Sequence, residues 1–193
     1  MGKPMITRPR IIYVVPLSDV VMLHLDCVAE SIQIHFGTEV RIIENQGLPT
    51  HALDASRKQY NSNLILKQLL DICPPDTLKI LGVTDLDLFS PIFKYVFGEA
   101  QFGGKGAVIS SYRLRGDPDG NSERGCPPLA DRMEKEAIHE LGHTFGLRHC
   151  NDPDCVMHYS VGIQCADRKF AFFCPICREL MLWHMAKDLF LKA

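Results

Sequence analysis

The sequence has little of several features that mark common classes of protein. Among 193 residues there is a single tryptophan, and 21 basic residues nearly balance 23 acidic ones, for a net charge of −2. That balance gives no electrostatic reason to expect nucleic acid or an anionic membrane as a partner. The longest early apolar run, residues 11–17, is too short for a membrane span, and no small-residue cleavage site follows it.

No secretion signal is therefore visible, and this bears on the eight cysteines. Disulfides persist in oxidising compartments, so we expect a cytoplasmic protein whose cysteines are reduced thiols or metal ligands. The composition, 46% hydrophobic and 23% charged, is that of one globular unit. Interleaved basic and acidic residues between positions 113 and 132 predict a solvated surface there.

Strand and helix patterns alternate through the first half of the chain. The β-branched run at residues 11–17 is continuous, which favours a central strand covered on both faces. The expected elements are a strand at 11–17, a helix from a Ser18 N-cap to Gly37, a strand at 39–43, a helix at 54–72 and a strand at 78–83. This order is typical of a right-handed βαβ layout with a largely parallel sheet.

Beyond residue 85 the pattern is more broken. Two further strands are expected near residues 93–97 and 107–111, one of them at a sheet edge, followed by a loop at 115–128. A helix should begin around Leu129, with its buried stripe formed by Met133, Ala137, Ile138, Leu141 and Phe145. The spacing of Leu180, Trp183 and Leu189 predicts a closing helix after Pro175.

Residues 139–149 read HELGHTFGLRH. His139 and His143 are four apart on the expected helix, with Cβ atoms about 5–6 Å from each other, so both rings can reach one ion. Glu140 is rotated by about 100° around the helix and lies near a water on that ion, where a general base belongs. Gly146 can adopt a positive φ, which lets the chain turn so that His149 approaches from another side.

Three neutral imidazoles leave a zinc ion one open position, at which the pKa of a bound water falls to roughly 7. The alternative is that these are ordinary helix histidines, since a bare HExxH also occurs by chance. The glycine and the third histidine at fixed offsets favour the catalytic zinc site.

A second constellation pairs Cys150 with Cys155 and Cys174 with Cys177. Two close pairs are typical of a closed four-thiolate structural zinc site, and two disulfides are the alternative, with Cys165 a possible substitute ligand. Because Cys150 adjoins His149, this site would help to aim the third catalytic ligand. The remaining cysteines lack such spacing and are expected to be small buried hydrophobes: Cys27, Cys73, Cys126 and Cys165.

The stretch from His139 to Cys177 resembles the archaemetzincins, zinc metallopeptidases of the metzincin clan. The resemblance includes the long histidine motif, the cysteine after its last histidine, Cys155-Val156-Met157, Asp167-Arg168 and residues 173–177, and it extends to residues 84–87 and 96–100. It implies that His139, His143 and His149 bind catalytic zinc and that Glu140 is the base. It also implies that Met157 is the turn methionine beneath the site and that the four cysteines hold a second zinc.

The same resemblance implies an α/β (α+β) fold of the metzincin type. This fold has a mixed, twisted, mostly parallel sheet with one antiparallel edge strand, flanking helices and a zinc-binding helix. Residues 1–149 would form the catalytic N-terminal subdomain, and residues 150–193 a small zinc-stapled C-terminal one. A peptide substrate would pair along the edge strand, for which residues 97–106 are the candidate.

The leading functional hypothesis is peptide-bond hydrolysis by a zinc-bound water that Glu140 activates. A non-hydrolytic zinc-binding adaptor and a small-molecule amidase are the alternatives. Tyr159, two residues after Met157, resembles the tyrosine of the astacin Met-turn and would either donate to the developing oxyanion or only pack under the site. We expect a peptide or protein substrate, no nucleic-acid or membrane partner, and a monomer.

Overall fold

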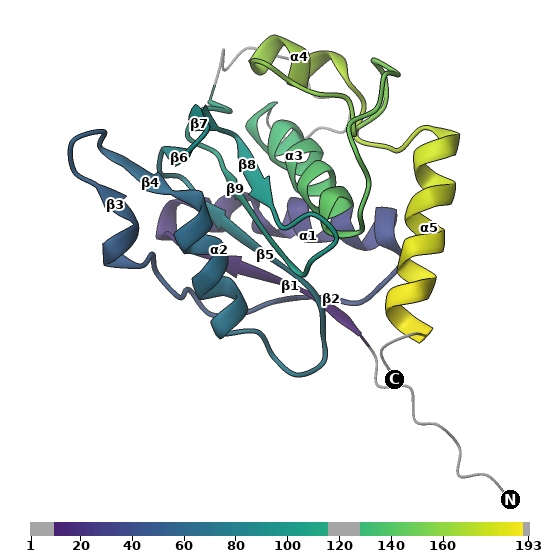
Figure 1. Ribbon diagram of the computed structural model, residues 1–193, viewed down its shortest axis with the longest axis horizontal. Helices are drawn as coiled ribbons and strands as arrows, with labels where there is room; N and C mark the ends of the chain where they lie inside the picture. The colour runs from purple at the N-terminus through teal and green to yellow at the C-terminus, as the bar shows by residue number, and fades with distance from the viewer. Residues whose placement is uncertain (1–9, 116–127, 191–193) are drawn as a thin grey trace, which may run out of the picture.

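A five-stranded sheet forms the centre of the computed structural model, which describes residues 10–115 and 128–190. Its strands, in spatial order, are β2 (Val40–Ile42), β1 (Ile11–Pro16), β5 (Thr77–Thr84), β9 (Gly106–Ser110) and β8 (Gly98–Ala100). All neighbours pair in parallel except β8, which runs antiparallel to β9 at the edge. The predicted mostly parallel sheet with an antiparallel edge strand is confirmed (Figure 1).

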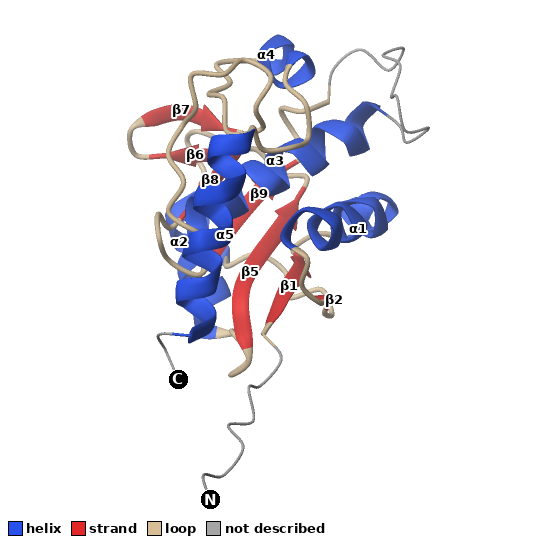
Figure 2. Cartoon of the chain, turned by 90° about the vertical axis from the view of Figure 1, so that its right-hand side faces the viewer, coloured by secondary structure: helices blue, strands red, loops and turns tan. Residues whose placement is uncertain are grey.

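Helices cover both faces of this sheet (Figure 2). On one face α1 (Leu25–Phe36) and α3 (Pro128–Thr144) bury their apolar stripes, and on the other α2 (Ser62–Asp71) does so. Every residue of β1 is buried, alternate side chains entering the two cores. This explains why its sequence is a continuous apolar run rather than an alternating one.

The start of the first helix differs from the prediction. A 3-10 helix, Asp19–His24, precedes α1, and Ser18 caps neither of them with its side chain. The Ser18 hydroxyl instead accepts a hydrogen bond from the backbone N–H of Asp85 at 3.2 Å. The predicted end is confirmed, because Gly37 adopts φ 61° after the last helical residue.

The predicted helix at 54–72 is wrong in its first eight residues. A 3-10 helix (Thr50–Ala52) leads into two short strands, β3 (Leu53–Asp54) and β4 (Gln59–Asn61), and α2 begins only at Ser62. The Asn61 side chain caps α2 by accepting from the N–H of Asn63. With β6 (Leu88–Ser90) and β7 (Phe93–Val96), these strands form a second, four-stranded sheet. The strand predicted near residues 93–97 is β7, at the edge of this sheet, whereas β3, β4 and β6 were not predicted.

The C-terminal part contains α4 (Ile163–Arg168), which was not expected, and α5 (Pro175–Phe190). The residues of α5 that face the core are Cys177, Met181 and Met185, whereas Leu180 and Trp183 are about half exposed and the side chain of Leu189 lies outside the described part. The predicted closing helix is therefore present, but Leu180 and Trp183, whose spacing predicted it, do not form its core-facing stripe. Once Cys177 faces inward, residues four and eight further on must face inward too, whatever their hydrophobicity.

The expectation of a solvated surface is wrong for Arg132. This residue is buried, and its guanidinium donates to both carboxylate oxygens of Asp167, at 2.5 and 2.8 Å, which ties α4 to α3. Arg124, Cys126 and most of the predicted loop at 115–128 lie outside the described residues.

The C-terminal segment shares the core of the first subdomain. Phe173 packs on Phe36 with ring centroids 5.8 Å apart, and Val156 belongs to the same cluster as α1 and α3. The division between residues 149 and 150 stays a prediction. Within residues 10–115 and 128–190, none of the helices combines the length and apolarity needed to cross a membrane. The cytoplasmic location also stays a prediction.

Candidate active site

The side chains of His139 and His143, on the last turns of α3, converge. The Nε2 atoms of His139 and His143 lie 3.1 Å apart. The Nδ1–H of His139 donates to the carbonyl oxygen of Val156 at 2.8 Å, and that of His143 to the carbonyl oxygen of Leu147 at 2.7 Å. These bonds fix the tautomer and leave each Nε2 as a free acceptor, as ligation of a metal requires.

His149 completes the group after a turn at Gly146, whose φ of 84° ends the helix as predicted. Its ring centroid lies 5.3 Å from that of His139 and 4.9 Å from that of His143, and one ligand atom from each ring lies within 4.8 Å of the others. Burial lowers the pKa of all three imidazoles, most strongly at His139. Neutral, convergent imidazoles are the donor set that zinc takes, so these residues fit the ion.

Glu140 lies beside the histidines and is buried. A Cβ atom on Gly98, the first residue of β8, would stand 2.6 Å from Glu140 Cγ, so the glycine leaves room for this side chain. Burial, the neighbouring Glu136 and Glu99 raise the pKa of the Glu140 carboxyl well above its usual value. Glu136 lies one turn earlier on α3 and shares a side-chain hydrogen bond with Glu140.

Lys169 is a site residue that the sequence analysis missed. Its side chain is buried, with 1% of the residue exposed, and Nζ lies 3.4 Å from His139 Nδ1 and donates to the carbonyl oxygen of His158 at 3.3 Å. Burial lowers its pKa, while the carboxyls of Glu136 and Glu140 act in the opposite direction. It directly follows Asp167-Arg168, but no spacing rule connects a lysine there with a helix that ends at Thr144.

Met157 and Tyr159 come from the turn beneath α3. A Cβ on Gly142 would lie 2.5 Å from Met157 Sδ, so the glycine inside the histidine motif permits the buried methionine to touch the helix. The ring centroids of Tyr159 and His149 are 4.8 Å apart, and Tyr159 is 47% exposed. Both residues therefore lie next to the histidine cluster, and their roles, Met157 as the turn methionine and Tyr159 as a catalytic or packing residue, stay predictions.

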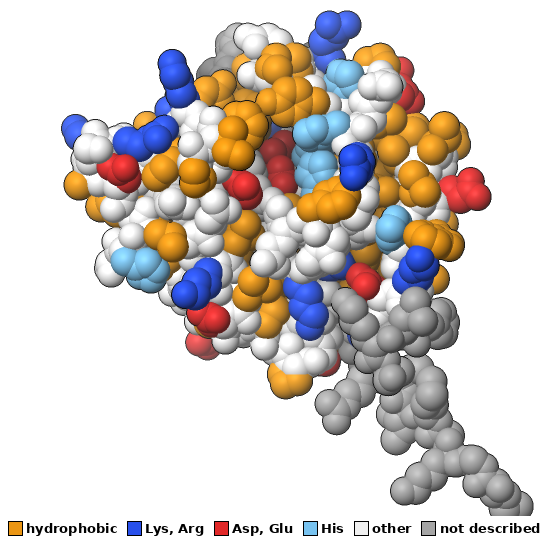
Figure 3. Space-filling model, viewed as in Figure 1, with side chains coloured by type: hydrophobic (Ala, Val, Ile, Leu, Met, Phe, Trp, Pro, Cys, Tyr) orange, Lys and Arg blue, Asp and Glu red, His pale blue; other side chains and the backbone are white. Residues whose placement is uncertain are grey.

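A cleft of about 410 Å³ opens above these groups. Its floor is formed by α3 with Glu136, His139 and Glu140, one rim by residues 93–100 and the other by residues 159–161. Figure 3 shows acidic and histidine side chains together in this hollow, bordered by hydrophobic ones. The cleft is thus polar where water would react and apolar along its walls.

The four cysteines Cys150, Cys155, Cys174 and Cys177 also come together, their Sγ atoms all within 4.8 Å of one another. The Sγ atoms of Cys150 and Cys174 are 3.8 Å apart, a separation that a tetrahedral ion bound at about 2.3 Å would produce. Burial raises the pKa of Cys155 to about 11 and that of Cys177 further. A divalent cation would offset the repulsion between four thiolates held this close together.

The other described cysteines do not join this cluster. Cys27, Cys73 and Cys165 are half-buried, and none of the seven described cysteines is in a disulfide, so the two-disulfide alternative finds no support in the described residues. Cys165 is not among the four convergent sulfurs.

Comparisons with known proteins show which family the chain resembles. Residues 15–182 match the family model described as Peptidase family M54. An archaemetzincin from Archaeoglobus fulgidus is 40% identical over 168 residues, which cover 86% of this chain and 95% of that protein. One from Methanopyrus kandleri is 41% identical over 145 residues, covering 74% of this chain and 78% of that protein.

Solved structures are similar over nearly the whole chain. The crystal structure of the Methanopyrus kandleri archaemetzincin superposes with a TM-score of 0.81 at 33% identity, covering 95% of this chain and 98% of that one. The Archaeoglobus fulgidus archaemetzincin, crystallised in complex with malonate, gives a TM-score of 0.75 at 36% identity, covering 88% and 99%.

Proposed function

Because the chain belongs to peptidase family M54, the archaemetzincins, and is a zinc metallopeptidase, we propose that it hydrolyses peptide bonds with water activated by Glu140. The observation that carries this proposal is the meeting of three imidazole nitrogens beside a buried carboxylate at the floor of an open cleft. His139, His143 and His149 are the proposed ligands of the catalytic zinc.

Zinc bound there would polarise the scissile carbonyl and lower the pKa of a water molecule. Glu140 accepts the proton of the attacking water and then delivers it to the departing amine nitrogen. Glu136 holds Glu140 by a hydrogen bond in which one of the two carboxyl groups donates its proton to the other, and the charge of Lys169 favours ionisation of this pair. The hydrogen bonds to the Val156 and Leu147 carbonyls hold the orientation of the His139 and His143 rings during the reaction.

The four-cysteine cluster is proposed to hold a second, structural zinc, giving two ions per chain. Its sulfurs are close enough for one tetrahedral ion and leave no open position for substrate. A peptide substrate would extend along β8, the antiparallel edge strand beside Glu140, in a protein that acts as a monomer without nucleic acid.

The proposal is tested with Glu140→Gln, which keeps the shape of the side chain and removes the base. Hydrolysis of a peptide library by zinc-loaded protein should fall by about 10²–10⁴ while zinc content stays unchanged. Glu179→Gln, on the exposed face of α5, is the matched control. A wild-type rate that survives Glu140→Gln would refute the mechanism. Zinc-loaded wild-type protein that hydrolyses no peptide would favour the adaptor or the small-molecule amidase.

A further inference from the structure

The rim of the cleft that contains β7 has few backbone hydrogen bonds to the rest of the protein. Strand β7 is the edge of the small sheet, and its only strand neighbour in the described chain is β6. The pairing is irregular, with Leu88 opposite Val96 and Ser90 opposite Phe93 and a register shift between. An exposed edge strand with so few ladder bonds has low local stability. Its position depends on side chains that reach it from elsewhere.

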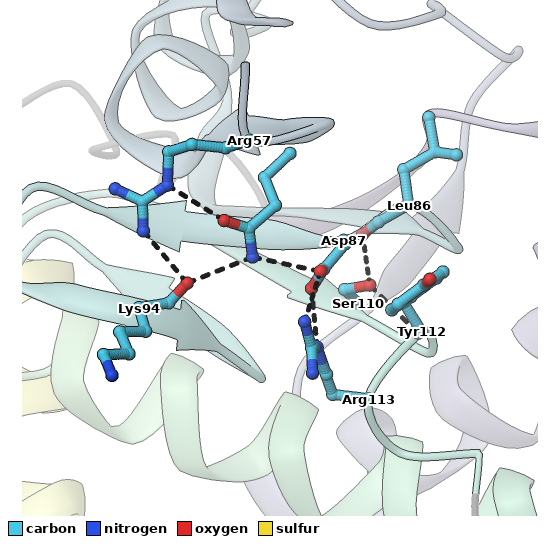
Figure 4. Close-up of polar contacts among 8 residues, drawn as sticks. Arg57, Leu86, Asp87, Lys94, Ser110, Tyr112 and Arg113 are labelled. Carbon is cyan, nitrogen blue, oxygen red and sulfur yellow. Dashed lines mark hydrogen bonds and ion pairs between the residues drawn. The ribbon is translucent and has the colours of Figure 1, made fainter. Parts of the chain in front are cut away.

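Two side chains bind the backbone of β7 at one carbonyl. Gln59 Nε2 donates to the carbonyl oxygen of Lys94 at 3.0 Å, and Arg57 Nη2 donates to the same oxygen at 3.1 Å. Arg57 Nε also donates to Gln59 Oε1 at 3.0 Å, so the two donors hold each other (Figure 4). The carbonyl that they share precedes Tyr95.

Asp87 extends this network towards β9. Its carboxylate accepts two hydrogen bonds from Arg113, from Nε at 2.8 Å and from Nη2 at 2.6 Å, and a third from Gln59 Nε2 at 3.0 Å (Figure 4). Asp87 is 9% exposed, so this bidentate pair is shielded on the carboxylate side. Charge-assisted pairs of this geometry are the strong and directional ones.

Arg113 also touches β7 through a ring. Its guanidinium carbon lies 4.6 Å from the centroid of Tyr95, and Tyr95 in turn packs edge-on against Phe97, with centroids 5.9 Å apart. Tyr95 and Phe97 both line the cleft. One network thus holds the backbone of the rim through Gln59 and an aromatic side chain of the rim through Arg113.

We propose that Arg113, held by Asp87, is a positioning residue that fixes the ring of Tyr95 in the substrate cleft. The ring of Tyr95 then contacts the side chain of the peptide beside the scissile bond and selects an apolar one. This inference rests on the proposed peptidase function. The occupant is apolar because Tyr95 and Phe97 face a rim that carries Tyr159 and Val161. A ring that is already held in place distinguishes between substrate side chains better than a mobile ring, because it loses no conformational freedom when the substrate binds.

The test measures Kd for two peptide hydroxamates that differ only in having phenylalanine or alanine next to the hydroxamate, on zinc-loaded protein. Tyr95→Ala should reduce the preference for phenylalanine by about tenfold, and Tyr95→Phe should retain it. Arg113→Gln should weaken binding of the phenylalanine peptide about three- to tenfold and speed amide hydrogen exchange in residues 93–96. Where turnover is measurable, Arg113→Gln should raise KM and leave kcat unchanged.

Arg113→Lys distinguishes geometry from charge, because an ammonium neither pairs bidentately nor stacks as a guanidinium does, and it should behave like Arg113→Gln. Arg115→Gln is the control, since Arg115 pairs with Asp85 at 3.2 Å outside this network, and it should change neither Kd nor exchange.

Full rescue by Arg113→Lys, or unchanged exchange and Kd in Arg113→Gln, would overturn the proposal. A wild type that binds neither peptide, or both equally, would overturn it too. If the wild type discriminates between the peptides but hydrolyses no substrate, the proposed function fails while the role of Tyr95 is still decided by the binding data.

Discussion

The histidine and cysteine clusters adjoin at His149-Cys150 but are built in opposite ways. Two of the three histidines stand on one helix and the cluster opens to the cleft. The four cysteines come from two separate stretches of chain, and Cys155 and Cys177 are buried. An open site supported by a rigid helix suits turnover, whereas a closed site that joins distant segments suits stability.

The two clusters nevertheless depend on each other. The segment between Cys155 and Cys174 carries the Val156 carbonyl, Met157 and Lys169, all of which contact α3 or His139. Cys150 is bound to the same segment, because its N–H donates to the Met157 carbonyl at 2.9 Å. Closing the cysteine cluster therefore places the groups that orient the histidine site, so a change in one cluster should be felt in the other.

The largest expected effect is that of Cys174→Ser. The protein should lose one of two zinc equivalents, and loss of a structural metal is among the changes that cost more than about 4 kcal/mol, which lowers Tm by roughly 8–16 °C in a chain of this size. The remaining zinc should bind about 10–100-fold more weakly, because the Val156 carbonyl loses its support. Elemental analysis and calorimetry measure these changes. One zinc equivalent in metal-replete wild type would refute the four-thiolate site.

His143→Ala is the counterpart for the other cluster. It should also remove one zinc equivalent and abolish hydrolysis, but its Tm should stay closer to that of the wild type, since the cleft side of α3 gains little stability from the ion. If both variants lower Tm equally, the contrast between a catalytic and a structural cluster is wrong.

Lys169→Met should affect both stability and turnover. Removing one member of a buried charged group costs roughly 3–5 kcal/mol, and loss of a group that supports the ligands should slow hydrolysis about 10–100-fold. Lys79→Met is the matched control, because Lys79 is equally buried but donates to the carbonyls of Gly104 and Thr144 and to Asp188, each at 2.8 Å. It should lower Tm and leave the rate per folded molecule near that of the wild type. Equal rate losses in both variants would mean that Lys169 acts only through stability.

Tyr159→Phe has the smallest expected effect. If the hydroxyl donates to the oxyanion, kcat should fall by about 10²–10³ with KM, zinc content and Tm unchanged. If Tyr159 only packs against the ring of His149, the expected change in kcat is less than about threefold. Steady-state kinetics at matched zinc occupancy decides between the two.

Much of the fold and site could be predicted because the signals are local. The continuous apolar run of β1, the i, i+4 histidines and the glycine before His149 each reflect constraints that act within a few residues. The helix at 54–72 was predicted too long because Asn61, a cap, lies within a stretch whose polarity also suits a helix surface. Of the small sheet only β7 was predicted, from the alternation near residues 93–97, because strands of two or three residues such as β3, β4 and β6 carry almost no periodicity.

By itself, then, the sequence determined the metal chemistry, since ligand type and spacing along the chain decide which ions a chelate can hold. Only the tertiary structure decided which charges surround that chemistry. Lys169 meets Glu136 and Glu140, and Arg113 meets Tyr95, across distances along the chain that no spacing rule spans. The physical reason is that burial and pairing of charges depend on which surfaces pack together, and packing is a property of the whole fold.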